Sequence, residues 1–418
     1  MSIEFDTDVI VVGAGIAGLR CAIELQSKGI QTIILDSSER VGGRMKTDLR
    51  DGFRLDRGFQ VLLTAYDECS SVLDYDSLKL GAFEPGALVW TGSRMEKLID
   101  PWRRPRQLLT AAFSPVGSFQ DKLRVGGLRE KLRRKAVHSI YEGEEKSTLE
   151  KLKEIGFSAA FIESFFRPFY SGIFLENDLS TGSKMFEFVF KMFGQGYAAL
   201  PHDGISAIPL QLSKRLDPNT VLTKQRVVKL APNNITTEEG SRFTAQHIVL
   251  ATDMSSANTL AKIESLDRDW NGTYCHYYAA PNSPLPEPFI ALNGSGKGYI
   301  TNIAVPTDVN RGYALDSESL ICVSTSKPVS KDELAPELYS WFGNVSQNFR
   351  FLADYSIPHA LPRQLPRDNA YGEAELRTPA GHWICGDYRY SSSIQGAMAS
   401  GRMVGKALCK ELTRQGER

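Results

Sequence analysis

The chain is 418 residues long, more than one ordinary domain, and its 49 basic and 49 acidic residues give a formal net charge of zero. A neutral balance gives no electrostatic reason to expect a nucleic-acid partner. Six widely spaced cysteines argue against zinc or a disulfide framework, so we expect no metal. No apolar run reaches membrane-spanning length, and a strand pattern begins by residue 8, leaving no room for a targeting peptide, so we expect a cytoplasmic protein.

The first predicted elements are a strand, a glycine-rich turn and a helix. The apolar run Val9–Val12 predicts a buried parallel strand, and a helical pattern follows through Leu25. Between them, Gly13 allows a tight turn, Gly15 leaves space for a pyrophosphate, and Gly18 lets the helix lie close to the strand. The free amides at the start of such a helix attract phosphate. The segment therefore predicts a dinucleotide site.

The next two features strengthen that prediction. A second apolar strand, Thr32–Leu35, ends in Asp36, which is placed to bind ribose hydroxyls and favours an unphosphorylated ribose. It is followed by Arg40-Val41-Gly42-Gly43-Arg44, in which two glycines stand beside an arginine. Small residues let the backbone approach a phosphate, and a guanidinium can pair with it through two hydrogen bonds.

Residues 66–199 have mostly helical patterns. Ser147–Glu150 is a capping box that opens one helix. An apolar-rich helix over Ser158–Phe166 is expected to stop at Pro168. This part of the chain lies between the motifs at either end and is expected to belong to a second domain.

Two features of that region leave alternatives open. The aromatic stretches at 165–170 and 186–190 either pack a core or line an apolar substrate cavity. The segment 102–135 is rich in arginine and lysine among apolar residues. It forms either a solvated helix face or a basic amphipathic surface that serves membrane contact.

Strand patterns return after residue 200. Leu200–Pro209 leads into an amphipathic helix, and Arg226–Leu230 and His247–Thr252 predict two strands. Short alternating runs broken by prolines predict further strands over 271–325. The chain therefore alternates between cofactor-type motifs and a separate set of helices and strands.

The C-terminal segment carries a third motif. His382–Asp387 predicts a strand that ends in a Gly-Asp turn, and Ser391–Ser393 precede a helical pattern to Leu412. The serines are expected to cap this helix, whose first amides can stabilise negative charge. Together with the motifs at 9–44, this segment resembles the flavin-dependent amine oxidase superfamily, which includes monoamine oxidases, protoporphyrinogen oxidases, phytoene desaturases and carotenoid isomerases.

The resemblance implies an α/β fold, with a Rossmann-type, glutathione-reductase-like FAD-binding domain and a second, α+β substrate domain. Because the motifs are interleaved, both domains are discontinuous in sequence. We predict the FAD-binding domain at residues 1–65, 200–262 and 355–418, and the substrate domain at 66–199 and 263–354. The resemblance also implies FAD held without a covalent bond, since no cysteine or histidine stands where the family makes one.

The resemblance assigns cofactor contacts motif by motif. It places Arg44 at the pyrophosphate, Asp387 at the ribityl chain, Val228 at the adenine and Gly58 where the backbone approaches the flavin ring. The predicted cofactor-binding residues are Gly13, Gly15, Ile16, Ala17, Gly18, Asp36, Ser37, Arg40, Gly42, Gly43, Arg44, Gly58, Phe59, Gln60, Val228, Ala251, Thr252, Gly386, Asp387, Ser393, Ile394 and Ala397.

Catalysis in this superfamily relies on the flavin as hydride acceptor, so the protein mainly orients the substrate and excludes water. The catalytic residues are not identified by the sequence. The candidates are Arg57, Gln60, Tyr66 and Tyr388, each with a purely structural role as the alternative. The expected partner is a small apolar molecule, peripheral membrane contact is an alternative, and the oligomeric state is not indicated.

Two departures from the amine oxidase pattern bear on the substrate. Amine oxidases usually carry a lysine in the strand that corresponds to Thr273–Tyr278, and this strand holds none. They also tend to have an aromatic cage residue where Ser393 stands. Both favour a desaturase, isomerase or porphyrinogen oxidase. We expect an FAD-dependent oxidoreductase of an apolar skeleton; the alternatives are a flavin amine oxidase, an isomerase that uses reduced FAD without net oxidation, and a catalytically silent flavin-binding protein.

Overall fold

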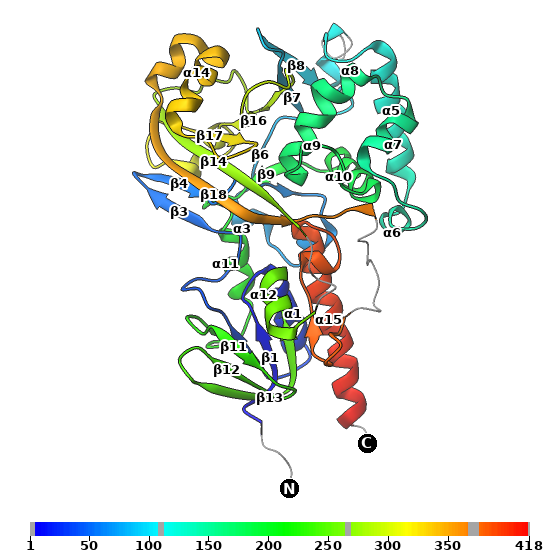
Figure 1. The fold of residues 1–418 in the computed structure, drawn as a ribbon, viewed down its shortest axis with the longest axis vertical. Coiled ribbons are helices and arrows are strands. Elements are labelled where there is room, and N and C mark those ends of the chain that lie inside the picture. Colours follow the sequence, from blue (N-terminus) through cyan, green and yellow to red (C-terminus); the bar gives the residue numbers. More distant parts are fainter. Residues whose placement is uncertain (1–4, 108–112, 264–268, 367–375, 417–418) are drawn as a thin grey trace.

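The computed structural model describes residues 5–107, 113–263, 269–366 and 376–416. These residues form two lobes (Figure 1). The lower lobe contains the first strand and the C-terminal helix, and both chain termini lie at its far end. The upper lobe contains a second sheet and a group of helices beside it.

The lower lobe is built on a sheet that confirms the predicted strands. Its parallel part joins the strands in the order β10, β2, β1, β13 and β19, and two antiparallel strands, β12 and β11, extend it from β13. The bounds are β10 (Val221–Leu222), β2 (Thr32–Leu35), β1 (Thr7–Val12), β13 (Arg242–Leu250), β19 (Trp383–Ile384), β12 (Asn234–Thr237) and β11 (Val227–Leu230).

The continuous apolar run of β1 is explained by burial on both faces of the sheet. Val9 and Val11 pack in one core cluster, whereas Ile10 and Val12 pack in another. Helices α1 (Ile16–Gln26) and α15 (Ile394–Gly416) pack against each other, and α15 ends beyond the predicted Leu412. A strand covered on both sides has no solvent face, so it shows no polar alternation.

The upper lobe is built on a second sheet, in which all neighbours are antiparallel except β15 and β7. Helix α14 (Lys331–Phe342) packs on one face. The strands, in sheet order, are β18 (Arg350–Pro362), β14 (Trp270–Ala280), β17 (Ser319–Thr325), β16 (Ile300–Ala304), β15 (Ile290–Asn293), β7 (Gly86–Trp90) and β8 (Met95–Ile99). The domain boundary predicted at residue 355 falls within β18, so we propose to place it after Pro362 instead.

The strands predicted over 271–325 are confirmed, but the mostly helical expectation for 66–199 was incomplete. Strands β7 and β8 form a hairpin in that region, because their apolar segments pair with each other and cover the edge of the second sheet. A small three-stranded sheet consists of β5 (Leu62–Leu63), β9 (Ala198–Leu200) and β6 (Gly81–Ala82).

The helices of the upper lobe include α5 (Phe119–Arg134), α7 (Thr148–Ile155), α8 (Ala159–Phe161), α9 (Arg167–Phe174) and α10 (Ser183–Gln195). The capping box at Ser147 is confirmed: its hydroxyl accepts from the amide of Glu150, whose carboxylate accepts in return. The stop at Pro168 was wrong. A π-helical turn leads directly into α9, and Pro168 is the second residue of α9, so the helical path continues through the proline.

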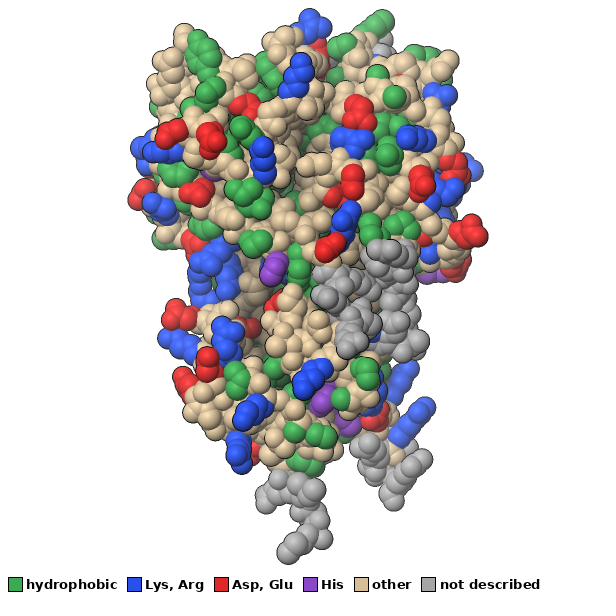
Figure 2. Space-filling model, in the orientation of Figure 1, with side chains coloured by type: hydrophobic (Ala, Val, Ile, Leu, Met, Phe, Trp, Pro, Cys, Tyr) green, Lys and Arg blue, Asp and Glu red, His purple; other side chains and the backbone are tan. Residues whose placement is uncertain are grey.

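Apart from 3-10 turns, the remaining described strands and helices are short and connect the larger ones. They are the hairpin β3 (Thr47–Arg50) and β4 (Phe53–Asp56), with the helices α2 (Asp67–Ser70), α3 (Tyr75–Leu78), α6 (Val137–Ile140), α11 (Ala207–Ser213), α12 (Met254–Ala261) and α13 (Pro306–Val309). Among the described residues, every helix is too short or too polar to cross a bilayer. Charged side chains of both signs are interspersed over the face drawn in Figure 2.

Candidate functional site

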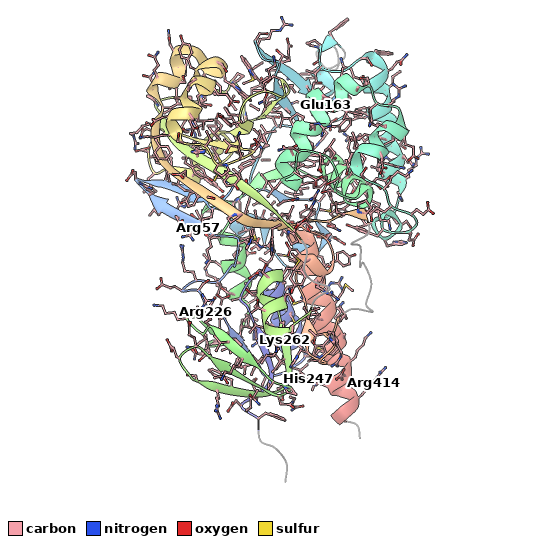
Figure 3. All side chains as sticks on the ribbon, viewed as in Figure 1. Arg57, Glu163, Arg226, His247, Lys262 and Arg414 are labelled. Atoms are coloured by element: carbon pink, nitrogen blue, oxygen red, sulfur yellow. The ribbon has the colours of Figure 1, made fainter. Side chains whose placement is uncertain are left out.

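A cavity of about 1360 Å³ connects the two lobes. It begins at the carboxyl ends of β1, β2 and β13 and ends among the aromatic side chains of α9 and α10. Arg57 and Arg226 both line it; Figure 3 places Arg57 at the junction of the lobes and Arg226 in the lower lobe. A pocket for one small ligand usually measures roughly 300 to 1,000 Å³, so this cavity has room for a cofactor and a substrate together.

The glycine-rich turn after β1 has the shape that a pyrophosphate needs. A Cβ added to Gly15 would meet no atom within 4 Å, and Gly15 lines the cavity. Gly13 has a φ of +111°, and a Cβ there would lie 2.7 Å from the carbonyl oxygen of Ala251. A Cβ on Gly18 would lie 2.0 Å from the carbonyl oxygen of Gly13, so α1 packs closely on the turn. The space beside Gly15 fits a phosphate.

Asp36 fixes the other side of this turn. It is 8% exposed, and its two carboxylate oxygens accept hydrogen bonds from the backbone amides of Ala14 and Ser38, both at 2.7 Å. The residue also lines the cavity. Each carboxylate oxygen can accept a further hydrogen bond, so Asp36 fits the predicted contact with ribose hydroxyls.

Arg44 and Asp387, predicted to hold different parts of the cofactor, contact each other. Nη2 of Arg44 lies 2.7 Å from Oδ1 of Asp387, and Nη1 donates to the carbonyl of Ala360 at 2.8 Å. The guanidinium also lies 5.6 Å from the centre of the Trp270 ring. Burial opposes the charge, but the attraction to Asp387 and the hydrogen bond with it outweigh burial and raise the pKa of Arg44. The pair presents a fixed cation to the cavity.

Helix α15 begins at the cavity wall. Ser393 caps it by accepting from the amide of Gly396 at 3.0 Å, which confirms the capping prediction. The hydroxyl of Ser392 donates to the carbonyl of Pro362 at 2.8 Å and ties the helix start to β18. Ser393, Ile394 and Ala397 line the cavity, so the positive end of the helix dipole faces it.

Three predicted site residues do not line the cavity, whereas all the others do. Gly18 serves the packing described above. Arg40 turns towards the hairpin, where it donates to the carbonyl of Thr47 at 3.2 Å and to Asp48 at 2.9 Å. Tyr388 is 4% exposed and packs in the core on the other face of the first sheet, with its hydroxyl 3.4 Å from the carbonyl of Cys385. Its neighbour Asp387 reaches the cavity, so the two adjacent side chains diverge.

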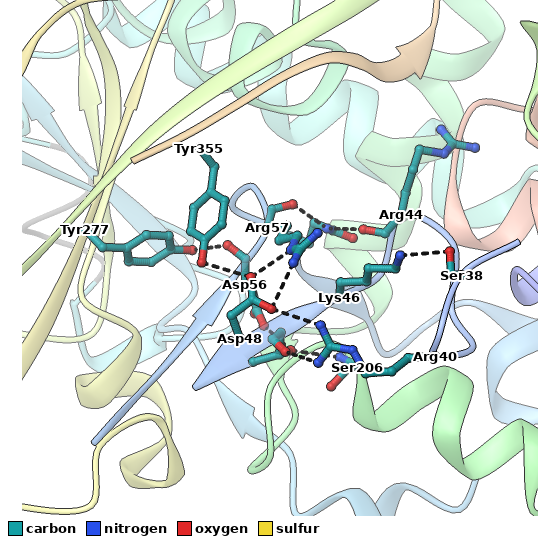
Figure 4. A network of polar contacts seen from close by, with 12 residues as sticks. Ser38, Arg40, Arg44, Lys46, Asp48, Asp56, Arg57, Ser206, Tyr277 and Tyr355 are labelled. Carbon is teal, nitrogen blue, oxygen red and sulfur yellow. Dashed lines mark hydrogen bonds and ion pairs between the residues drawn. The ribbon is translucent and has the colours of Figure 1, made fainter. Parts of the chain in front are cut away.

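The segment after β4 crosses the junction between the lobes. Gly58 has a φ of +87°, and a Cβ there would lie 3.0 Å from Cδ1 of Ile357 and 3.3 Å from Cγ2 of Thr273. Glycine therefore permits both the turn and the close approach to β18 and β14. Thr273, from the strand that lacks a lysine, lines the cavity at this point. Arg57 also lines it and pairs with Asp48 at 2.7 Å (Figure 4).

Asp48 is the centre of a polar network at this junction (Figure 4). It accepts from Arg57, from Arg40 and from the hydroxyl of Tyr355, the last at 3.1 Å. Partial burial favours the neutral form, but the hydrogen bonds from Arg57 and Arg40 outweigh it and hold the pKa of Asp48 at about 2. Arg57 is thus held by a carboxylate that stays ionised.

Asp56 lies behind that network and joins the lobes. Its carboxylate accepts from the hydroxyls of Thr47 and Tyr313, both at 2.6 Å, and from the amide of Ile205 at 3.0 Å. Its carbonyl accepts from the hydroxyl of Tyr277 at 2.7 Å. Asp56 is 3% exposed, and desolvation outweighs these hydrogen bonds and raises its pKa to about 6.

The upper end of the cavity is apolar, and both alternatives for the aromatic stretches hold. Phe186 and Phe188 pack in the core, and Tyr66 stacks on Phe188 with ring centres 5.8 Å apart while also lining the cavity. The aromatic side chains of the π-helical turn and its neighbouring helices that line the cavity are Phe161, Phe165, Phe166, Phe169, Tyr170, Phe190 and Phe193.

Parts of the wall were missed from the sequence. Residues 84–86 and 98–103 line the cavity, as do Ser255, Ser256 and Thr259 of α12. For α12 a signal exists, because Asp253 follows the strand end and caps the helix by accepting from the amide of Ser256. For residues 84–86 and 98–103 no local sequence pattern predicts that they line the cavity, because this depends on how the lobes pack.

The model of the family of flavin containing amine oxidoreductases matches residues 16–408. The chain belongs to this family. The predicted α/β fold class is confirmed.

Individual relatives match over short segments. Protoporphyrinogen oxidase 2 of Arabidopsis thaliana is 36% identical over 66 residues, 16% of this chain and 13% of that protein. A 4,4'-diapophytoene desaturase of Staphylococcus haemolyticus is 44% identical over 55 residues, 13% of this chain and 11% of that one. The structure of a putative protoporphyrinogen oxidase from Exiguobacterium sp. 255-15 shares the fold, with a TM-score of 0.73 at 14% identity over 98% of this chain and 100% of that chain.

Proposed function

We propose that this protein oxidises a small apolar organic molecule, with non-covalently bound FAD as the hydride acceptor. The observation that carries the proposal is the continuous cavity, which has the glycine turns and Asp36 at one end and an aromatic wall at the other. Two occupants can meet inside it, and the substrate end offers apolar contacts on most sides. An apolar skeleton requires such a dry, shaped space more than it requires a charged partner.

The residues present fit FAD. Bound FAD supplies the hydride acceptor of the reaction. The pyrophosphate would lie in the open space beside Gly15, near the cation of Arg44, with Asp36 at the ribose and Val228 at the adenine. Val228 is 45% exposed on β11 and lines the cavity, as that contact requires.

The substrate would be oriented by side chains that are themselves held. The side-chain amide of Gln60 donates to the carbonyls of Arg44 and Arg57, at 3.2 and 3.1 Å. Burial raises the pKa of Tyr66, so its hydroxyl stays protonated and can donate a hydrogen bond. Gln60 and Tyr66 are the positioning candidates. The strand Thr273–Tyr278 holds no lysine, and Ser393 stands where an amine oxidase would offer a cage aromatic.

The test is anaerobic stopped-flow absorbance of the FAD-loaded protein. The purified protein is expected to be yellow and to release intact FAD on denaturation. A polyene or porphyrinogen-like substrate is expected to bleach the flavin, whereas simple primary and secondary amines are not. Rapid, saturable bleaching by a common amine would contradict the proposal and restore an amine oxidase. Conversion of substrate without change in mass, by pre-reduced protein only, would contradict it in favour of an isomerase.

A further inference from the structure

The mouth of the cavity is apolar and exposed. Trp102, Phe119, Leu123 and Tyr197 line the cavity, and yet these residues are 52%, 68%, 60% and 46% exposed. Residues with both properties lie where the cavity meets solvent. We call these four residues the rim.

Half of the rim is presented by α5, which has two apolar faces. Leu128 and Leu132 on its inner face pack in the upper-lobe core. Phe119 and Leu123, one helical turn apart, lie on an outer face that the described residues leave in solvent. Phe113, ahead of the helix, is 83% exposed. Large apolar side chains grouped in this way on a surface mark an interaction site.

The aromatic residues of the rim are backed by cations. The ring of Trp102 lies so close to α5 that a Cβ on Gly126 would come within 2.9 Å of it. The guanidinium of Arg129 lies 5.1 Å from the centre of that ring, and the guanidinium of Arg103 lies 3.8 Å from the centre of the Tyr197 ring. The rim is therefore a packed surface rather than a set of loose side chains.

The segment that carries the rim is strongly basic. Residues 102–135 contain ten lysines and arginines but only two acidic residues, in a chain whose net charge is zero. Four carboxylates outside the segment form ion pairs with its cations: Glu84, Asp100, Glu187 and Glu287. Together with the two acidic residues inside the segment they make six, so the ten cations remain in excess. An excess of cations around exposed aromatic and leucine side chains matches the chemistry of anionic lipid headgroups above acyl chains.

We propose that the rim docks on an anionic lipid bilayer, with Trp102, Phe119 and Leu123 entering the boundary between headgroups and acyl chains. The cavity would then open onto the bilayer, and an apolar molecule could enter it without crossing water. The protein would lie on the membrane surface, because no described helix is suited to spanning it. The inference rests on the proposed function only for the nature of the molecule that enters; docking itself requires no turnover.

The test measures flotation of the FAD-loaded protein with vesicles, in the absence of substrate. Binding is expected to vesicles of phosphatidylcholine mixed with phosphatidylglycerol, to weaken as salt is raised, and to be much weaker to phosphatidylcholine alone. The double variant F119A/L123A is expected to lower the partition coefficient at least about tenfold, because it removes two large apolar side chains from the contact.

The matched control is L49A/L315A, which removes two leucines that are 69% and 71% exposed and lie outside the cavity lining. It is expected to bind vesicles like the unchanged protein, and the flavin spectrum and circular dichroism of each variant verify its fold. Absence of binding to the anionic vesicles at low salt, or an equal loss in the control, would overturn the proposal. So would light scattering that shows a dimer dissociated by F119A/L123A, since the rim would then be an interface between copies. Because no substrate is used, failure here is distinct from failure of the flavin-bleaching test.

Discussion

Replacing Asp56 by asparagine should change how stability depends on pH. The folded state raises the pKa of this carboxyl from its ordinary 3.8 to about 6, chiefly by desolvation. A raised acid binds more protons when folded than when unfolded between these two values, so stability falls as pH rises through that window. Two units correspond to about 3 kcal/mol, a loss that is complete above pH 6 and absent below the unfolded pKa.

Asparagine resembles the protonated acid, because its oxygen can still accept from Thr47 and Ile205 while its amide faces the Tyr313 hydroxyl. Urea unfolding of the unchanged protein and of Asp56→Asn, measured from pH 4 to pH 8, gives the difference in unfolding free energy. Relative to the variant, the unchanged protein should lose about 2.4 kcal/mol between pH 4 and pH 7, because part of the full change already occurs below pH 4.

Asp48→Asn is the control, because its sign is opposite and its window lies lower. The pKa of Asp48 is held at about 2, so its contribution is present above the unfolded value and is lost only as pH falls towards 2. Its difference curve should be flat from pH 5 to pH 8. Parallel curves for the unchanged protein and Asp56→Asn would refute the reasoning, since Asp56 would then carry no buried charge.

Three further predictions concern the cavity. Gly15→Val should keep the fold of the apoprotein but abolish FAD retention, which is measured as bound flavin. Gly18→Ala should instead destabilise the apoprotein by roughly 1 to 3 kcal/mol through overpacking, which is measured by unfolding curves. Arg44→Ala and Asp387→Ala should each weaken FAD binding by about 1 to 3 kcal/mol in fluorescence titrations. Because the two side chains form one ion pair, the double mutant should lose less binding free energy than the sum of the two single losses. Additive losses would exclude coupling between the two residues. Tyr388→Phe should leave turnover and the flavin spectrum unchanged, and a large fall in kcat would place it at the reaction after all.

The sequence predicted those parts of the fold that local patterns determine. The strand Val9–Val12 and the capping box at Ser147 depend on neighbours a few residues away, and both were confirmed. The prediction at Pro168 was wrong because the sequence alone does not distinguish a proline near the start of one helix from a proline that ends the preceding helix. The β7 and β8 hairpin was missed because its pairing with β15 joins distant segments.

The candidate site shows the same division. Motif spacing predicted the open turn at Gly15, and the expectation that Ser393 caps α15 was confirmed, whereas Gly18 was predicted as a cofactor contact and does not line the cavity. The contact between Arg44 and Asp387 could not be predicted, because it depends on the bends at both motifs and on the place of Ala360 on β18. Nor could the sequence show that Tyr388 turns away from the cavity while the adjacent Asp387 enters it.

The order of strands in the lower lobe also constrains when this protein can fold during its synthesis. Strand β1 pairs with β2 at once, but its other neighbour is β13, which begins at Arg242, and β13 in turn awaits β19 at Trp383. Helix α15 then packs on α1 so closely that a Cβ on Gly401 would lie 2.2 Å from the carbonyl oxygen of Ala17. Strand β1 therefore keeps an open edge until β13 has been synthesised, and the sheet is completed only when β19 follows more than 130 residues later. Its apolar side chains need shielding until then, because pairing between such distant segments is slow.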